Sequence, residues 1–172
     1  MTLQTQRLVV RDPLACDLPG WHRLFSGKSN MRFVEHLQCQ SLEESRETLQ
    51  RAIDAANRAP RVKCFFTIEL VQSGEFIGSI GFMTEQMNYG LQGNVGWFLL
   101  PEYQGKGYAT EAFAALIPCM FTEWCVDCIN AGCNVANPAS ERVMQKGGLS
   151  LTKRQGDRLQ YQLMKTDWEK NM

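Results

Sequence analysis

Short apolar runs separated by polar or turn-forming residues recur along most of the chain, and this pattern predicts a sheet of several strands. Two turn sequences join neighbouring runs: Gln72-Ser73-Gly74 and Gln155-Gly156-Asp157 are typical hairpin connections. An antiparallel meander and a C-terminal hairpin are therefore expected. The predicted strands cover residues 3–11, 64–71, 75–83, 95–100, 129–135, 149–154 and 159–165.

Apolar residues at helical spacing predict helices between these strands. Asp17 can cap a short helix, and Ser41 with Glu44 forms a capping box for a second helix that ends before Pro60. Residues 31–39 have no clear period, so we expect a loop there. Residues 85–94 are polar and contain two glycines, so we expect a connection between strands.

Two further helices are predicted in the second half of the chain. Apolar residues fall at 109, 112, 113, 116 and 120, which is the spacing of an amphipathic helix. Pro118 should kink this helix because proline removes a backbone donor. Asn137 and Pro138 are favourable first residues for a short helix that ends at Gly147-Gly148.

Size and charge restrict the classes of protein to consider. The chain has 172 residues, 44% of them hydrophobic, which is typical of one domain with a full-sized core over residues 1–172. Eighteen basic and eighteen acidic residues balance, so strong electrostatic binding of nucleic acid is not indicated. No apolar run approaches the roughly 20 residues of a membrane span and no signal peptide is seen, so we expect a cytoplasmic protein.

The seven cysteines are an odd number in a chain of cytosolic character, which argues against a disulfide framework. Cys125, Cys128 and Cys133 lie close together in sequence, but no histidine is near them. A strand over residues 129–135 would also direct Cys128 and Cys133 to opposite faces. We therefore expect free thiols and no metal site.

The most informative stretch is the glycine-rich turn between the strand at 95–100 and the helix after it. Gly105 and Gly107 allow the backbone to approach a ligand, and a helix N-terminus supplies free N–H groups and partial positive charge. Residues 104–109 are therefore suited to binding a phosphate or diphosphate. A tight turn that binds nothing is the alternative from the glycines alone.

A dinucleotide-binding turn is a third interpretation of the same residues. Gly105, Gly107 and Thr110 are one glycine short of that fingerprint, with Asp127 at about the expected distance. However, this turn follows a meander and does not open a βαβ unit, which argues against the interpretation.

The amino-acid sequence of this turn resembles the signature of a known family. Gln104-Gly105-Lys106-Gly107-Tyr108-Ala109 is similar to the Gln/Arg-x-x-Gly-x-Gly/Ala signature of the GNAT superfamily of N-acetyltransferases. The phrases Asn137-Pro138-Ala139-Ser140 and Asp167-Trp168-Glu169 also stand at the family's spacing, and the likeness is greatest to the RimJ/RimL-type, ribosomal-protein branch. The resemblance covers residues 5–168. It implies a mixed α/β fold, with a twisted, mostly antiparallel sheet of about seven strands flanked by about four helices.

The resemblance also implies a substrate and a set of binding residues. Acetyl-CoA would be the co-substrate, with its diphosphate on the glycine-rich turn and its pantetheine arm along the central strand. A backbone N–H of Phe98 or Leu99 would bind the acetyl carbonyl. The implied acetyl-CoA-binding residues are Phe98, Leu99, Leu100, Gln104, Gly105, Lys106, Gly107, Tyr108, Ala109, Thr110, Asn137 and Ser140.

Two catalytic positions follow from the same resemblance. Many members protonate the departing thiolate with a tyrosine, but the matching residue here is Met144. The ribosomal-type branch instead has a serine at the position of Ser140, and the resemblance therefore implies Ser140 as the candidate acid. Ser140 is equally compatible with a capping role in its helix. The branch often has a glutamate as general base where this chain has Asn94, an amide that cannot accept a proton. Glu85, Glu35 and His36 remain as candidate bases.

Function therefore has two interpretations: an N-acetyltransferase that acts by direct transfer in a ternary complex, or a non-catalytic acyl-CoA sensor of the same fold. The sequence does not identify the acceptor amine, which a protein N-terminus or a small molecule can supply. In the family, the first two helices and the loop between them cover the acceptor side. A monomer and a homodimer are both compatible with the sequence.

Overall fold

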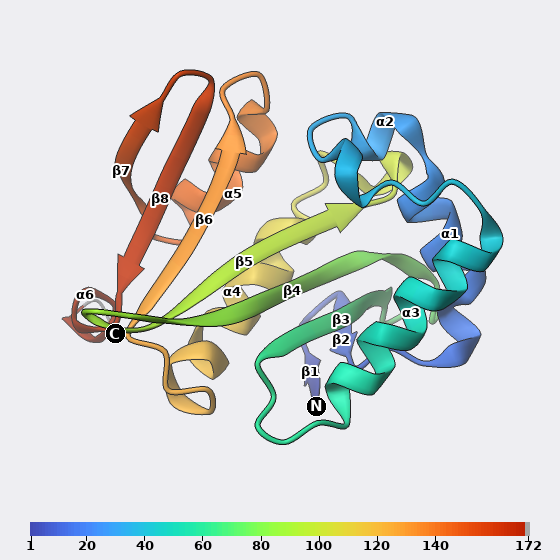
Figure 1. Ribbon diagram of the computed structural model, residues 1–172, viewed down its shortest axis with the longest axis horizontal. Helices are drawn as coiled ribbons and strands as arrows, with labels where there is room; N and C mark the ends of the chain where they lie inside the picture. The colour runs from blue at the N-terminus through green and yellow to red at the C-terminus, as the bar shows by residue number, and fades with distance from the viewer. Residues whose placement is uncertain (171–172) are drawn as a thin grey trace.

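The computed structural model describes residues 1–170, and these form one twisted sheet with helices on both faces (Figure 1). The eight strands lie in the order β1-β2-β3-β4-β5-β6-β8-β7. Every neighbouring pair is antiparallel except β5 and β6. The strands are β1 (Thr2–Gln4), β2 (Leu8–Arg11), β3 (Lys63–Leu70), β4 (Phe76–Met87), β5 (Gly90–Leu99), β6 (Cys128–Asn134), β7 (Ser150–Gln155) and β8 (Arg158–Met164). The predicted mixed α/β fold is confirmed.

Helices α1 and α3 lie on one face of the sheet and α4 on the other (Figure 1). The central strand contacts both layers, because the ring of Phe98 packs on Phe25 of α1 while Trp97 packs on Phe113 of α4. Within residues 1–170 the helices are α1 (Leu18–Ser26), α2 (Lys28–Met31), α3 (Leu42–Ala56), α4 (Tyr108–Thr122), α5 (Pro138–Lys146) and α6 (Lys165–Lys170). Short 3-10 turns cover Ala15–Asp17, Glu35–Leu37 and Pro101–Tyr103.

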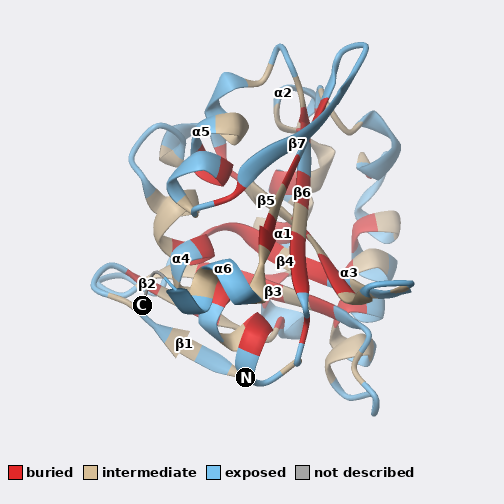
Figure 2. Ribbon diagram, turned by 90° about the vertical axis from the view of Figure 1, so that its left-hand side faces the viewer, coloured by how far each residue is buried: buried red, intermediate tan, exposed pale blue. Residues whose placement is uncertain are grey.

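The main core lies between the sheet and α4, where Figure 2 shows the buried segments gathered. The apolar stripe predicted for this helix supplies it, since Phe113, Leu116 and Met120 are fully buried. The helix continues through Pro118 to Thr122, and the kink at that proline stays a prediction. Burying such side chains is worth about 1.5–3 kcal/mol each, which fixes the N-terminus of α4 beside the end of β5.

Most predicted strand boundaries shift by one residue, and two larger corrections concern residues 85–94 and the first strand. Residues 85–94 are not a loose connection: β4 and β5 run through them as a long hairpin in which Met87 pairs with Gly90. Glu85 and Gln86 are adjacent, so their side chains point to opposite faces of the hairpin, and both are exposed. With polar side chains on both faces, the composition showed no period of two. The first predicted strand is two strands, because Thr5 hydrogen-bonds Leu8 and turns the chain. The last strand ends at Met164, where α6 begins.

A buried ion network ties the first strands to the 3-10 turn before α1. The guanidinium of Arg11 donates to both oxygens of Asp17, at 2.9 and 2.7 Å, and also binds Glu69. Asp17 further accepts from the N–H of Leu14 and the hydroxyl of Thr67, both at 2.8 Å. Burial by itself raises the pKa of Asp17, but these hydrogen bonds outweigh it and hold the pKa below its ordinary value.

We predict that Asp17→Asn destabilises the fold by about 3 kcal/mol, because it removes the charge that balances a partly buried guanidinium. The lowered pKa stabilises the fold above the ordinary carboxylate pKa of about 3.9, and that stabilisation is lost as the pH falls through the native value. Urea denaturation from pH 7 to pH 3 should show the difference between wild type and variant shrinking at low pH. Glu43→Gln, in the exposed Glu43–Arg46 pair, should change stability by under about 0.5 kcal/mol. A difference that is independent of pH would contradict this account.

Candidate functional site

The two parallel strands in the middle of the sheet part from each other after a short contact. β5 and β6 pair only at Gln92, Gly93 and Asn94, opposite residues 128–130. Beyond that point β5 continues along β4, while β6 continues along β8 (Figure 1). The sheet therefore opens into a V at the carboxyl end of β5.

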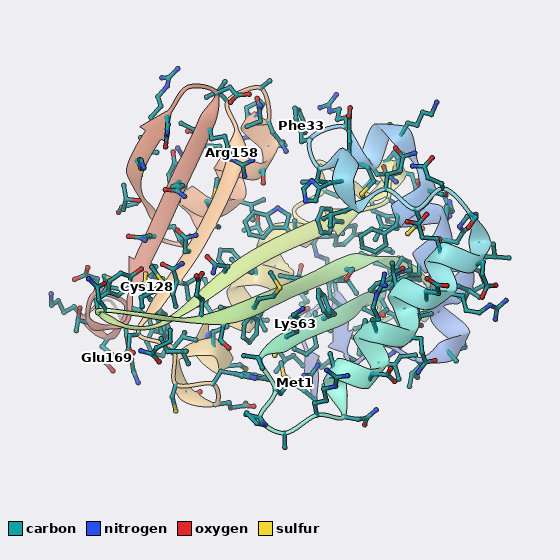
Figure 3. All side chains as sticks on the ribbon, viewed as in Figure 1. Met1, Phe33, Lys63, Cys128, Arg158 and Glu169 are labelled. Atoms are coloured by element: carbon teal, nitrogen blue, oxygen red, sulfur yellow. The ribbon has the colours of Figure 1, made fainter. Side chains whose placement is uncertain are left out.

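A cleft of about 590 Å³ occupies this opening. Its walls come from the end of β5, the glycine-rich turn with the first residues of α4, the end of β6, helix α5 and the segment after α2. Figure 3 labels Phe33 and Arg158, which lie on opposite sides of the wide end of the V. Most of the residues expected to bind acetyl-CoA share this one cleft: Phe98, Leu99, Gln104, Gly105, Gly107, Tyr108, Ala109, Thr110, Asn137 and Ser140.

The direction of the β5 backbone decides which residues present polar groups to the cleft. The N–H of Asp127 donates to Leu91 O at 2.7 Å, on the β6 side, whereas the N–H of Leu100 donates to Ile77 O of β4 at 2.9 Å. Backbone N–H and C=O groups point alternately to the two sides of a strand. The backbone groups of Trp97 and Leu99 therefore point into the opening, and those of Phe98 point toward β4. Leu99 is thus the better placed of the two expected carbonyl donors, Phe98 and Leu99.

The sequence analysis did not include Trp97 among the binding residues. Trp97 is two residues before Leu99, so its backbone groups point to the same side of the strand. Leu100 is 1% exposed and does not line the cleft, and its N–H is already bonded. The backbone groups of β5 that face the V are therefore those of Trp97 and Leu99, with Val95 at its base.

The glycine-rich turn has the conformation that its sequence predicts. Gly105 and Gly107 have φ values of +74° and +83°, a region that side chains disfavour, and Gly107 is the N-cap of α4. The side chain of Gln104 folds back and donates to Leu99 O at 2.9 Å. This bond joins the turn to the end of β5, so the first-turn N–H groups of α4 lie next to the open edge of the strand.

Ser140 and Asn137 lie on the opposite wall, at the start of α5. The Asn137 side chain accepts the N–H of Ser140 at 3.2 Å, which confirms its predicted capping role. Among the described residues, nothing hydrogen-bonds the hydroxyl of Ser140, and this residue lines the cleft. The hydroxyl is thus free to serve a ligand, whereas Met144 is fully buried in the core.

Asn94 lies where the V closes, and its amide is occupied. Its side-chain oxygen accepts from Gln92 at 2.8 Å and from Asn130 at 2.9 Å, and its nitrogen donates to Glu85 at 3.3 Å. Two bonds use both acceptor positions of an amide oxygen. Asn94 joins the two strands at their last paired position and does not line the cleft. Its catalytic role stays a prediction.

The three candidate bases are separated in space. Glu85 contacts Asn94 directly. Glu35 and His36 lie in the 3-10 turn after α2, and neither lines the cleft. Of the three, only Glu85 is tied to the base of the V.

The cleft is lined by more positive than negative charge. Arg32, Arg142, Lys146 and Arg158 are its basic residues, and Asp157 is its acidic one. Arg142 and Lys146 stand one turn apart on α5, so they lie on one side of that helix. The sequence analysis missed this pair. Two basic residues four positions apart, in the helix that the Asn-Pro-Ala-Ser phrase begins, would have indicated it.

The cysteines and Asp127 have other places in the fold. All seven cysteines are unpaired, and Cys133 lines the cleft with a pKa raised by burial. Within residues 1–170 no group of three potential ligands for a metal ion occurs, and no helix is long and apolar enough to span a membrane. The carboxylate of Asp127 accepts the N–H of Leu91 at the start of β5, at the opposite end of the strand from the glycine-rich turn. Asp127 therefore cannot contact a dinucleotide bound at that turn.

Comparison with known proteins agrees with this geometry. The family model described as the acetyltransferase (GNAT) domain matches residues 7–150. The uncharacterized N-acetyltransferase YoaA of Bacillus subtilis is 26% identical over 148 residues, which cover 85% of this chain and 81% of that protein. The uncharacterized N-acetyltransferase YnaD of the same organism is 44% identical over 55 residues, and that match spans about a third (32%) of each protein.

The fold is also that of solved acetyltransferases. A structure of RimL, a ribosomal-protein α-N-acetyltransferase in complex with coenzyme A, superposes with a TM-score of 0.82 at 20% identity. The match covers 97% of this chain and 99% of that one. With the family model matched over most of its length, this chain belongs to the GNAT family of acetyltransferases.

Proposed function

We propose that this protein transfers an acetyl group from acetyl-CoA directly to a primary amine while both substrates are bound. The observation that carries the proposal is the V between β5 and β6, which places free backbone groups of a strand beside a glycine-rich helix N-terminus in one cleft. A thioester with a diphosphate at one end and a carbonyl at the other needs these two features at once.

The residues present fit this substrate. The N–H groups of residues 105–110 suit the diphosphate, since both glycines hold the left-handed conformation, whereas the N–H of Gln104 already donates to Pro101 O at 3.2 Å. The edge of β5 from Val95 to Leu99 suits the amides of the pantetheine arm. Acetyl-CoA carries one more phosphate group besides the diphosphate, and Arg142 and Lys146 supply positive charge for it. The residues that line the cleft carry a net positive charge, whereas the whole chain has a net charge of zero.

The chemistry then falls to few protein groups. The amine nitrogen attacks the acetyl carbon, the carbonyl oxygen gains negative charge, and the C–S bond breaks as the amide forms. In this proposal the N–H of Leu99 stabilises the oxyanion, and the hydroxyl of Ser140 protonates the departing thiolate. The amine's extra proton leaves to water or to a carboxylate.

The base requirement restricts the acceptor. Neutralising an α-amine of pKa near 8 at pH 7 costs about 1.4 kcal/mol, whereas a lysine amine of pKa about 10.4 costs roughly 4–5 kcal/mol. Asn94 cannot take a proton, and its oxygen is already bonded twice. We therefore favour an acceptor of low pKa, such as a peptide N-terminus, in a protein that works in the cytoplasm.

The occupied amide of Asn94 and the apolar Met144 also favour a second function: an acyl-CoA sensor that binds without turnover. Release of free thiol from acetyl-CoA with a panel of peptides, amino acids, aminoglycosides and polyamines separates the two. Turnover with any amine supports the enzyme, and tight binding without turnover across the panel supports the sensor.

Sedimentation of the same samples would give the oligomeric state, for which we predict a monomer or homodimer.

Gly107→Val should weaken acetyl-CoA binding by at least about tenfold, because a side chain at positive φ distorts the turn that holds the diphosphate. Lys106→Ala removes only an exposed side chain and should have a smaller effect. Gly148→Val is a matched control, since Gly148 has φ +82° and lies outside the cleft. Calorimetric titration that gives Gly107→Val the same affinity as wild type would overturn the assignment of the turn.

Ser140→Ala should lower kcat by about 10²-fold with little change in acetyl-CoA affinity, because a general acid acts mainly in the transition state. The N–H of Ser140 that bonds Asn137 is unaffected, so the helix cap persists. Steady-state kinetics at saturating acetyl-CoA measure the change. A loss under about threefold would return Ser140 to a purely structural role.

For Asn94→Ala we expect a loss of under about tenfold in kcat/KM, since only positioning is removed. The pH profile of wild type should follow the pKa of the acceptor amine. Two acceptors whose amine pKa values differ by about two units would show this. One common break that Glu85→Gln abolishes would instead establish Glu85 as the base.

A further inference from the structure

The N-terminal strand region reaches across to the glycine-rich turn through one carboxylate. Glu111, in the first turn of α4, accepts the hydroxyl of Thr5 at 2.6 Å and the N–H of Arg7 at 3.0 Å on one oxygen. Its other oxygen accepts Nε of Arg7 at 2.6 Å. Burial by itself raises the pKa of Glu111, but these hydrogen bonds outweigh it and lower the pKa, so the carboxylate is ionised at neutral pH.

The guanidinium of Arg7 also contacts the turn itself. Its Nη1 donates to the carbonyl of Lys106 at 3.1 Å, and its Cζ lies over the Tyr108 ring, 4.6 Å from the ring centre. A Cβ placed on Gly107 would lie 3.4 Å from its Nη2. One side chain from before β2 therefore contacts Lys106 and Tyr108 and lies beside Gly107 between them.

These contacts have an electrostatic consequence for an anionic ligand. A carboxylate in the first turn of a helix stabilises the helix but repels a phosphate bound at the same N-terminus. Arg7 neutralises Glu111 and draws the Lys106 carbonyl, another negative end of a dipole, toward itself. Removing Arg7 would leave an unbalanced charge on a Glu111 side chain that is 19% exposed.

We propose that Arg7 is a positioning residue for acetyl-CoA: it fixes the glycine-rich turn and cancels the charge of Glu111 beside the diphosphate. This inference rests on the proposed function, because it assumes that acetyl-CoA is the ligand of the turn. It assigns Arg7 to acetyl-CoA affinity, and it leaves the chemical step to the groups on β5 and α5.

The test is a double-mutant cycle on acetyl-CoA binding, with kinetics alongside. Arg7→Gln should raise the Kd for acetyl-CoA by about tenfold or more while kcat at saturation falls by less than about threefold. Glu111→Gln should change the Kd by less than about threefold, and the double variant Arg7→Gln/Glu111→Gln should recover most of the loss, because the repelling charge is gone. The effect of Arg7→Gln should also shrink at high salt.

Arg23→Gln is the matched control. It removes another arginine–glutamate pair, Arg23–Glu102, next to the same turn but exposed and without a contact to the turn's carbonyls. Its Kd should stay within about twofold of wild type. Should Arg7→Gln fold poorly in thermal denaturation, Arg7→Lys, which keeps the charge, is expected to bind more tightly than Arg7→Gln.

The outcomes separate cleanly. Wild-type binding of acetyl-CoA with an unchanged Kd in Arg7→Gln overturns the role of Arg7 alone. A double variant weaker than either single variant shows a merely structural pair and also overturns it. Wild type that does not bind acetyl-CoA overturns the proposed function and this inference together.

Discussion

The structure depends on one constraint: backbone groups of a strand that leaves its neighbour must find other partners. β5 and β6 share a ladder only up to Asn94 and Asn130, where a cluster of amides and the Glu85 carboxylate joins them. Beyond that cluster the two strands follow different neighbours. The edge of β5 therefore faces the cleft without a neighbouring strand, and this is the feature on which the proposed binding of a ligand depends.

The rest of the fold keeps this edge open. The packing of α4 on the sheet holds its N-terminus at the end of β5, and the Gln104 side chain bonds the turn to Leu99. On the other wall, α5 is capped by Asn137 and leaves the Ser140 hydroxyl free. A rigid core on one side and a helix cap on the other thus give the cleft fixed walls, which is what preorganised electrostatic stabilisation needs.

The N-terminal segment contributes more than a strand to the sheet. Thr5 and Arg7 stand just before β2, yet their side chains meet Glu111, more than a hundred residues later. Nearby, Arg11 and Asp17 fix β2 to the start of α1. The segment therefore supports the helix layers on both faces of the sheet, and its Arg7 bonds the glycine-rich turn.

The sequence by itself determined the local features of this protein. The alternation of residues 64–71 and 75–83, the capping box at Ser41, the cap at Asn137 and the glycines at 105 and 107 each depend on a few neighbouring residues. Such patterns predicted the order of most elements and a glycine-rich turn before α4, whose binding of a phosphate stays a prediction. They failed at residues 85–94, where polar side chains lie on both faces of a hairpin and leave no period of two.

Only the tertiary structure decided which polar groups meet. The direction of the β5 backbone assigns Leu99 and Trp97 to the cleft, and the approach of β6 occupies the oxygen of Asn94 through Asn130. Arg7 and Glu111 are brought together by the packing of α4 under β2, across a separation of 104 positions. No local period or spacing encodes such contacts, because they depend on the register and twist of strands that are distant in sequence.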